Sequence, residues 1–230
     1  MKLYCHPIST ASRPVMQFVI DAGIECEFIP VDLMQGEQRR PPYSTMNPNC
    51  LVPMLEDGDF LLTESSAILK YLAEKSDSPA YPGDLKARAR INELMDWFNT
   101  GFYREYGYHL IYPQIFPNHK RPTDEAHRGT IDWGKTQAAP ALAILDKHYL
   151  PGPGPFLTGA QEPSIADFFG VAIVTLGECI GVGLDAYANI GRWIAAMRAR
   201  PSWAEVNEMF EGFSASLAGQ PFETLGAVAS

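Results

Sequence analysis

Two short stretches of the chain supply groups suited to binding a carboxylate and pairing with an extended main chain. The segment Thr63–Ser66 provides hydroxyls and a carboxylate where a helix is expected to begin. The first N–H groups of a helix lack partners within the helix. Together with the Ser65 hydroxyl, they can therefore bind a carboxylate. Upstream, Pro53 gives up a hydrogen bond at the head of an expected strand and leaves the main chain of Val52 free for an outside partner.

A third set of groups precedes the first expected helix. Ser9, Thr10 and Ser12 occupy a turn-rich loop that leads into Arg13. A hydroxyl just before a helix can donate a hydrogen bond to an anion, and the helix N-terminus adds positive potential there. Ser12 is expected to cap the helix, which leaves Ser9 and Thr10 as the candidate donors.

Positioning these groups requires a strand, a tight turn, a second strand and a helix in that order. The apolar runs Val52–Leu55 and Phe60–Leu62 flank Asp57-Gly58, a residue pair that favours a β-hairpin. After the second run, apolar residues recur at helical spacing as far as Lys75, which predicts a helix.

The N-terminal third predicts alternating strands and helices. Lys2–His6 is an expected strand, Arg13–Ala22 a helix ended by Gly23, and Cys26–Leu33 a second strand. Gln35–Met46 is polar and is expected to be a loop with at most one helical turn. With that turn, the hairpin and its helix, the order is β-α-β-α-β-β-α, a thioredoxin-like α/β arrangement whose first crossover should be right-handed.

Beyond this domain only helices are expected. We divide the chain into a thioredoxin-like domain at 1–78, a linker rich in turn-forming residues at 79–86, and an all-α C-terminal domain at 87–230. Five segments have helical patterns: 85–110, 123–150, 164–180, 190–200 and 202–213.

Three motifs resemble those of the glutathione S-transferases, here of the theta-like bacterial class that includes dichloromethane dehalogenase-type enzymes. They are V-P-x-L at 52–55 before the Asp57-Gly58 turn, E-S-x-A-I at 64–68, and a reciprocal helix cap between Ser164 and Asp167. The resemblance spans most of the chain. It implies the glutathione transferase fold, a cis Pro53, main-chain pairing of Val52 with the cysteinyl part of glutathione, and contacts from Glu64 and Ser65 to the γ-glutamyl end.

The resemblance also implies that the glutathione thiol is converted to a thiolate at neutral pH. A thiol with a pKa of ~8.5 is only about 3% ionised at pH 7, and lowering that pKa by two units takes ~2.7 kcal/mol. One hydrogen bond to a charged acceptor supplies ~1.5–3 kcal/mol and a helix N-terminus ~0.3–1 kcal/mol, so a hydroxyl donor suffices. In the theta and phi classes the serine stands four residues before the helix-opening arginine, which selects Ser9; Thr10 is the alternative.

Further contacts to glutathione are implied near residues 38–51. Gln38 would replace a histidine of theta-like enzymes, and Arg39 or Arg40 would pair with the glycyl carboxylate; we assign Arg40. Leu51 departs from the family pattern, because its side chain cannot hydrogen-bond to glutathione. Cys50 would lie near the sulfur and is expected to be an inert thiol.

The electrophile pocket is expected between the serine loop, including Ile8, and the first long helices. Seven aromatic residues crowd the segment 97–112, and we assign Phe102, Arg104 and Tyr108 to the pocket. His109 is expected to be structural rather than a base.

Composition excludes several classes of function. Hydrophobic residues make up 46% of the chain and charged residues 20%, as in soluble globular proteins. The net charge of −9 disfavours nucleic acid as a partner. No apolar run approaches the ~18 residues of a membrane span, and the N-terminus lacks a signal-peptide pattern. The four cysteines are widely spaced, which predicts reduced thiols in a cytoplasmic protein and no metal site.

We therefore expect a cytoplasmic, homodimeric glutathione transferase that activates the thiol of its co-substrate glutathione for attack on a small hydrophobic electrophile, by conjugation or dehalogenation. Two alternatives stay open. One is a non-catalytic transferase-fold module that binds a protein partner. The other is a glutathione-dependent lyase, or a thiol-dependent reductase acting through Cys50.

Overall fold

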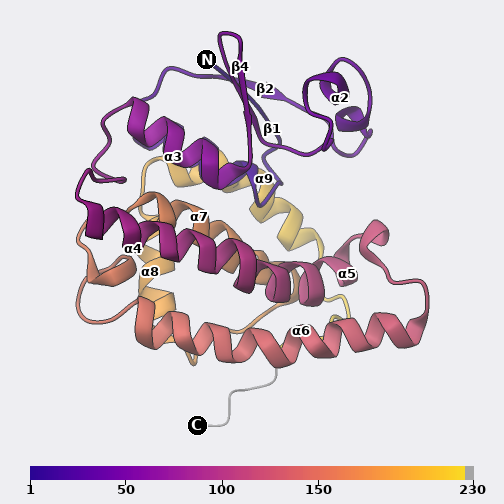
Figure 1. Ribbon diagram of the computed structural model, residues 1–230. Coiled ribbons are helices and arrows are strands. Elements are labelled where there is room, and N and C mark those ends of the chain that lie inside the picture. The colour runs from indigo at the N-terminus through magenta and orange to yellow at the C-terminus, as the bar shows by residue number, and fades with distance from the viewer. Residues whose placement is uncertain (226–230) are drawn as a thin grey trace.

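A four-stranded mixed sheet, ordered β2-β1-β3-β4, lies at the top of the molecule in Figure 1. The structure is a computed structural model that describes residues 1–225. Strand β1 (Lys2–Cys5) pairs in parallel with β2 (Glu27–Pro30) and antiparallel with β3 (Met54–Asp57). Strand β4 (Phe60–Thr63) pairs antiparallel with β3 and forms one edge. This sheet places the start of β3 next to the end of β1.

Two helices pack on this sheet. Helix α1 (Ser12–Asp21) connects β1 to β2, and α3 (Ser65–Lys75) follows β4; the two helices contact each other. The polar segment expected to hold at most one helical turn contains two short ones, η1 (Glu37–Arg39) and α2 (Tyr43–Met46).

The hairpin is shifted by one residue from its expected place. Asp57 pairs with Phe60, so the turn consists of Gly58 and Asp59, where the sequence pattern placed it at Asp57-Gly58. The first turn position has φ +66°, which glycine adopts without steric cost. Strand β3 begins only after Pro53, because proline cannot donate to the ladder.

The rest of the described chain is helical, which confirms the predicted order of a thioredoxin-like domain followed by helices. The elements are α4 (Leu85–Asp96), η2 (Trp97–Phe102), η3 (Arg104–Ile111), α5 (Tyr112–Ile115), η4 (Pro117–His119), α6 (Asp124–Ile144), η5 (Leu145–Tyr149), η6 (Leu157–Gly159), α7 (Ile165–Val174), η7 (Thr175–Ile180), α8 (Ala188–Arg198) and α9 (Ser202–Ser216). The last five residues of the predicted helical domain, 226–230, lie outside the described residues.

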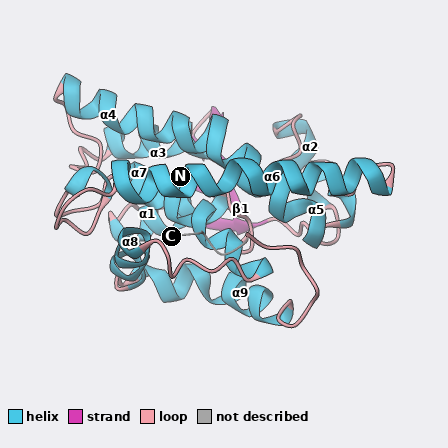
Figure 2. Ribbon diagram, turned by 90° about the horizontal axis from the view of Figure 1, so that it is seen from below, coloured by secondary structure: helices cyan, strands magenta, loops and turns pink. Residues whose placement is uncertain are grey.

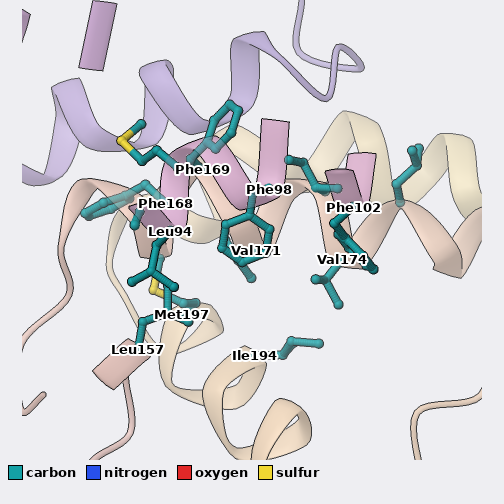
Figure 3. Close-up of a cluster of buried hydrophobic side chains, with 14 of the residues drawn as sticks. Leu94, Phe98, Phe102, Leu157, Phe168, Phe169, Val171, Val174, Ile194 and Met197 are labelled. Atoms are coloured by element: carbon teal, nitrogen blue, oxygen red, sulfur yellow. The ribbon is translucent and has the colours of Figure 1, made fainter. Parts of the chain in front are cut away.

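Helix α7 is the centre of the helical part. Every one of its residues is buried, and it contacts α1, α3, α4 and α8. In Figure 2 it lies between α4, at the top, and α8 and α9, at the bottom. Figure 3 shows Phe168, Phe169 and Val171 of this helix packed among apolar side chains of neighbouring helices. A buried helix of this kind positions the elements around it.

The reciprocal cap predicted at the start of α7 is present. Asp167 accepts hydrogen bonds from the Ser164 N–H and hydroxyl, both at 2.8 Å. It also accepts from the Leu157 N–H at 2.8 Å and the Trp193 indole at 2.9 Å, and it is fully buried. Asp167 therefore holds one helix and two neighbouring segments together, which is a structural role.

A buried arginine joins the sheet domain to the helices. Arg13, on α1, is 1% exposed and donates hydrogen bonds to Asn207 Oδ1 of α9 at 2.7 Å and to the Ala172 carbonyl of α7 at 2.9 Å. Its guanidinium lies 3.6 Å from the centre of the Phe210 ring. These contacts fix the start of α1, and therefore the loop before it, against the second domain.

The long helix that starts at Leu85 widens after its first three turns. Segments η2 and η3 are π-helical, with hydrogen bonds from residue i to residue i+5. Helix α6 packs closely on η3 at Gly134, where a Cβ atom would lie 2.7 Å from the Leu110 nitrogen. The wider turns change which side chains of this stretch point to the same side.

Candidate active site

One cavity of about 920 Å³ is lined by both the sheet domain and the helices. It brings together the loop before α1, the segment 47–53, the start of α3, and side chains of η2, η3, α5 and α9. Most of the site residues predicted from the sequence line it: Ile8, Ser9, Thr10, Gln38, Leu51, Val52, Pro53, Glu64, Ser65, Arg104 and Tyr108.

The serine loop is held by hydrogen bonds that leave the Ser9 proton available. The Ser9 hydroxyl oxygen accepts from the Ser12 N–H at 3.2 Å, at the first residue of α1. Ser12 does not cap the helix as expected; its own hydroxyl is buried and accepts from the His6 N–H at 3.3 Å. The Ser9 oxygen therefore accepts from the first N–H of α1, and the Ser9 O–H can donate into the cavity.

Val52 and Pro53 form a cis peptide at the cavity wall, as the resemblance implies. The ladders of β3 begin at Met54, so Val52 lies outside the pairing of the sheet. The Leu51 carbonyl accepts from the Tyr43 hydroxyl at 2.5 Å and from Asn47 Nδ2 at 2.7 Å, which fixes the chain just before Val52. The backbone edge of Val52 is thereby held toward the cavity.

The N-terminus of α3 also faces the cavity. Ser65 is the first residue of α3 and is 9% exposed, while Glu64 before it is exposed and has φ +68°. Within residues 1–225 no side chain caps this helix. Its first N–H groups and the Ser65 hydroxyl are therefore available to an anion in the cavity.

Arg40, which we assigned to glutathione, does not line the cavity, whereas its neighbour Arg39 does. The Arg40 side chain donates to the Gln35 carbonyl at 2.6 Å. The two residues are adjacent, and the η1 turn sends their side chains in different directions. Gln38 lines the cavity with a buried side-chain oxygen that has no partner among the described residues.

Phe102 does not line the cavity, which corrects a second assignment. It is 2% exposed and stacks between Trp97 and Tyr106 in the core. Tyr103, the next residue, lines the cavity instead. The crowding of aromatic residues in this stretch did not show which of them face the cavity.

Arg104 and Tyr108 do lie at the cavity, as predicted. The Arg104 side chain is 62% exposed at the rim and donates from Nε to Glu105 Oε1 at 2.7 Å. Tyr108 is 42% exposed. His109 lies outside the lining, and its Nδ1 is 2.8 Å from Glu105 Oε2.

An aromatic wall at the cavity was largely missed from the sequence. The side chains of Tyr112, Phe116 and His119 pack against one another there, and Phe116 stacks on Phe213 of α9. Aromatic residues recur at 103, 108, 112 and 116, spacings of four or five residues, and this recurrence was the available signal. The contribution of α9 had no local signal in the sequence.

The described part of the chain holds no group of three or more His, Cys, Asp or Glu side chains arranged to bind a metal ion. Across residues 1–225, the helices fall short of the combined length and apolarity needed to cross a bilayer. All four cysteines are free thiols, and Cys50 lines the cavity.

Comparison with known proteins identifies the family. The family model described as "Glutathione S-transferase, N-terminal domain" matches residues 1–74. The chain is 33% identical to glutathione S-transferase theta-2 of Homo sapiens over 204 residues, which cover 87% of this chain and 80% of the relative. It is also 33% identical to glutathione S-transferase theta-1 of Bos taurus over 216 residues, covering 92% and 86% of the two chains.

Solved structures agree with this result. The crystal structure of human glutathione transferase theta-2, in complex with glutathione and an unknown ligand, matches with a TM-score of 0.80 and 27% identity, and covers 98% of this chain and 93% of that chain. The apo form of human glutathione S-transferase T1-1 matches with a TM-score of 0.77 and 28% identity, over 93% and 90% of the two chains. The chain belongs to the glutathione S-transferase family and is theta-like.

Proposed function

We propose that this chain is a serine-type glutathione transferase in which the Ser9 hydroxyl stabilises the thiolate of bound glutathione. The observation that carries the proposal is the meeting of three features in one cavity. They are the Ser9 hydroxyl at the start of α1, the Val52 backbone edge, and the open N-terminus of α3 at Ser65. Theta-class relatives, one of them crystallised with glutathione, support the same activity, and they do not favour an interaction module, a reductase or a lyase.

The lining suggests how glutathione would be held. The γ-glutamyl carboxylate would bind at the N-terminus of α3 beside Ser65, and Glu64 would meet its ammonium group. The cysteinyl part would pair with Val52 like an added strand. Gln38 and Arg39 also line the cavity and would bind the glycyl end.

Ser9 would act as a hydrogen-bond donor, not as a base. The Ser9 oxygen already accepts from the Ser12 N–H, and the single hydroxyl proton of Ser9 can be donated to another acceptor. A hydrogen bond to a thiolate contributes about 1.5–3 kcal/mol, enough to lower the thiol pKa by one to two units. The thiolate is the reactive form, so kcat/KM should rise with pH up to the pKa of the bound thiol.

The second substrate would be a small hydrophobic electrophile. The aromatic wall and Ile8 supply an apolar surface next to Ser9 and Thr10, with Arg104 and Tyr108 at its rim. In the reaction the sulfur of the thiolate forms a bond to an electrophilic carbon. The bond from that carbon to its leaving group breaks with the electron pair, which describes both conjugation and dehalogenation.

The variant Ser9→Ala tests this proposal. Its bound thiol should titrate one to two units higher, and kcat/KM at pH 7 should fall about 10–100-fold, with little change in glutathione affinity. The measurements are calorimetry with glutathione and an ultraviolet pH titration of the thiolate. Ser66→Ala, whose hydroxyl is outside the cavity lining, is the matched control. Unchanged turnover in Ser9→Ala, or no heat with wild-type protein, would refute the proposal.

We also propose that the protein is a cytoplasmic homodimer with a detoxifying role. Support for a dimer comes from β4, an edge strand that exposes Phe60 and Leu61, 45% and 40% accessible. Four free thiols favour a reducing compartment. A screen of halides, epoxides, aryl ethers and activated alkenes would identify the electrophile and decide between conjugation and dehalogenation.

A further inference from the structure

Two tyrosines of the cavity form a chain of hydroxyl groups that ends at Thr10. The Tyr112 hydroxyl donates to Thr10 Oγ1 at 3.0 Å, and the Tyr103 hydroxyl is hydrogen-bonded to that of Tyr112. Tyr112 has a single hydroxyl proton, which is used on Thr10, so Tyr103 must be the donor in the second bond. The bonds therefore run in one direction, from Tyr103 through Tyr112 to Thr10.

Thr10 and Tyr112 are buried, Tyr103 is partly buried, and both tyrosines stay protonated. Thr10 is 5% exposed and Tyr112 is 8% exposed, yet both border the cavity. Burial raises the pKa of Tyr112 to about 12 and raises the pKa of Tyr103 well above its usual value. Both hydroxyls therefore remain donors throughout the range in which a thiol titrates.

The orientation of the Tyr103 ring is also fixed, by its contacts with Gly107 and Tyr108. A Cβ atom at Gly107 would lie 2.6 Å from two carbons of that ring, so the glycine backbone lies directly against it. The Tyr108 ring packs edge-on to the Tyr103 ring on the cavity side, with centroids 5.1 Å apart. Neighbouring atoms thus hold the first donor of the chain in place.

The free end of this chain is the proton of the Thr10 hydroxyl. The oxygen of Thr10 accepts from Tyr112, and among residues 1–225 no acceptor is hydrogen-bonded to its proton. Thr10 follows Ser9 directly and lines the same cavity. Hydrogen bonds in series polarise one another, by about 10–30% per bond, so two upstream donors make Thr10 a better donor than an isolated threonine.

We propose that Tyr112 and Tyr103 are positioning residues that make Thr10 a second hydrogen-bond donor to the glutathione thiolate, beside Ser9. This inference rests on the proposed function, because it concerns the same thiolate. Neither tyrosine needs to touch the sulfur. Tyr112 acts through the Thr10 oxygen, and Tyr103 acts through Tyr112.

The pKa of the bound thiol, followed by ultraviolet absorbance with saturating glutathione, tests the inference. Thr10→Val, which keeps the shape of the side chain, should raise that pKa by about one unit. Tyr112→Phe removes both upstream bonds and should raise it by about 0.2–0.4 unit, and Tyr103→Phe by less. The double variant Thr10→Val/Tyr112→Phe should match Thr10→Val alone, because the tyrosine has no route to the sulfur without the threonine hydroxyl.

The control is Tyr106→Phe, which also removes a buried tyrosine hydroxyl. That hydroxyl donates to the Val174 carbonyl at 3.2 Å and lies outside the cavity lining, so its loss should leave the thiol pKa unchanged. If Tyr112→Phe titrates like wild type while Ser9→Ala is shifted, the inference is wrong and the proposed function stands. Additive effects of Thr10→Val and Tyr112→Phe would likewise overturn it. If wild-type protein shows no thiolate, the proposed function itself fails.

Discussion

At the scale of single residues, Ser65 and Ser66 give the sharpest contrast. They are consecutive at the start of α3, but only Ser65 lines the cavity, with 9% of its surface exposed. A ligand carboxylate bound at this helix N-terminus would therefore accept a charge-assisted hydrogen bond from one serine and not from the other.

Ser65→Ala should weaken glutathione binding about 10-fold or more, the equivalent of about 1.5 kcal/mol for one hydrogen bond to a charged group. Calorimetric titration measures this directly. Ser66→Ala should bind like wild type, and equal losses in the two variants would contradict the placement of the carboxylate.

Residue types and spacing predicted most of the cavity lining. They did not predict which of two similar neighbouring side chains points into the cavity. Ser9, Val52-Pro53 and Glu64-Ser65 follow from local motifs whose geometry is set by nearby main chain. Arg39 and Arg40 are equally basic neighbours, and only the backbone of η1 decides which one turns inward. A sequence pattern does not contain that information.

At the scale of elements, Arg13 connects three helices. Its guanidinium donates to α9 and α7 and stacks on Phe210, all in a buried position, and burial lowers the pKa of the group to about 10. The fork of an arginine can reach two acceptors at once, which the single ammonium of lysine cannot reproduce.

Arg13→Lys should lower the free energy of unfolding by about 2–4 kcal/mol, because it loses one buried hydrogen bond and the ring contact and leaves an acceptor unsatisfied. Thermal or urea unfolding is the measurement. Arg128→Lys, at an exposed position of α6, should change stability by less than about 0.5 kcal/mol. Equal stability of the two variants would rule out the linking role of Arg13.

The order and type of the elements were predictable, since hydrophobic periodicity and turn residues specify them locally. The start of α7 followed from Ser164 and Asp167 alone, and the cap is present. The π-helical turns of η2 and η3 were not predictable, because the sequence pattern of this stretch fits an ordinary helix and the elements packed on it, such as α6 at Gly134, are distant in sequence.

At the scale of the whole molecule, the proposed homodimer depends on apolar surface that one copy leaves uncovered. Phe60 is on the edge strand β4 and leans against Tyr71 of α3, with ring centroids 5.5 Å apart. An exposed aromatic residue on an edge strand is a natural contact for a second copy.

Phe60→Glu should shift the protein from dimer to monomer, with the dissociation constant raised at least about 10-fold, because the change buries a charge in the contact. Light scattering across a concentration series measures the mass. Met209→Glu carries the same change on α9, where Met209 is 54% exposed, and should leave the mass unchanged. A dimer that survives Phe60→Glu would place the contact elsewhere.

The overall architecture of a small mixed sheet followed by helices was predictable because each half has its own periodicity. A pocket between the serine loop and the first long helices was also expected, but the contribution of α9 was not, since residues such as Phe213 reach the cavity only through long-range packing. The sequence therefore predicted the lining on the sheet side of the cavity better than the lining on the helical side.

The widened helix between Trp97 and Ile111 has a consequence for how this protein could evolve. Each wide turn contains nearly one residue more than a regular turn, so deletion of one residue there would return one turn to ordinary α-helical winding. The side chains that follow the deleted residue would then point in new directions. We expect such a deletion to change which aromatic rings border the cavity, and with them the electrophiles that the protein accepts.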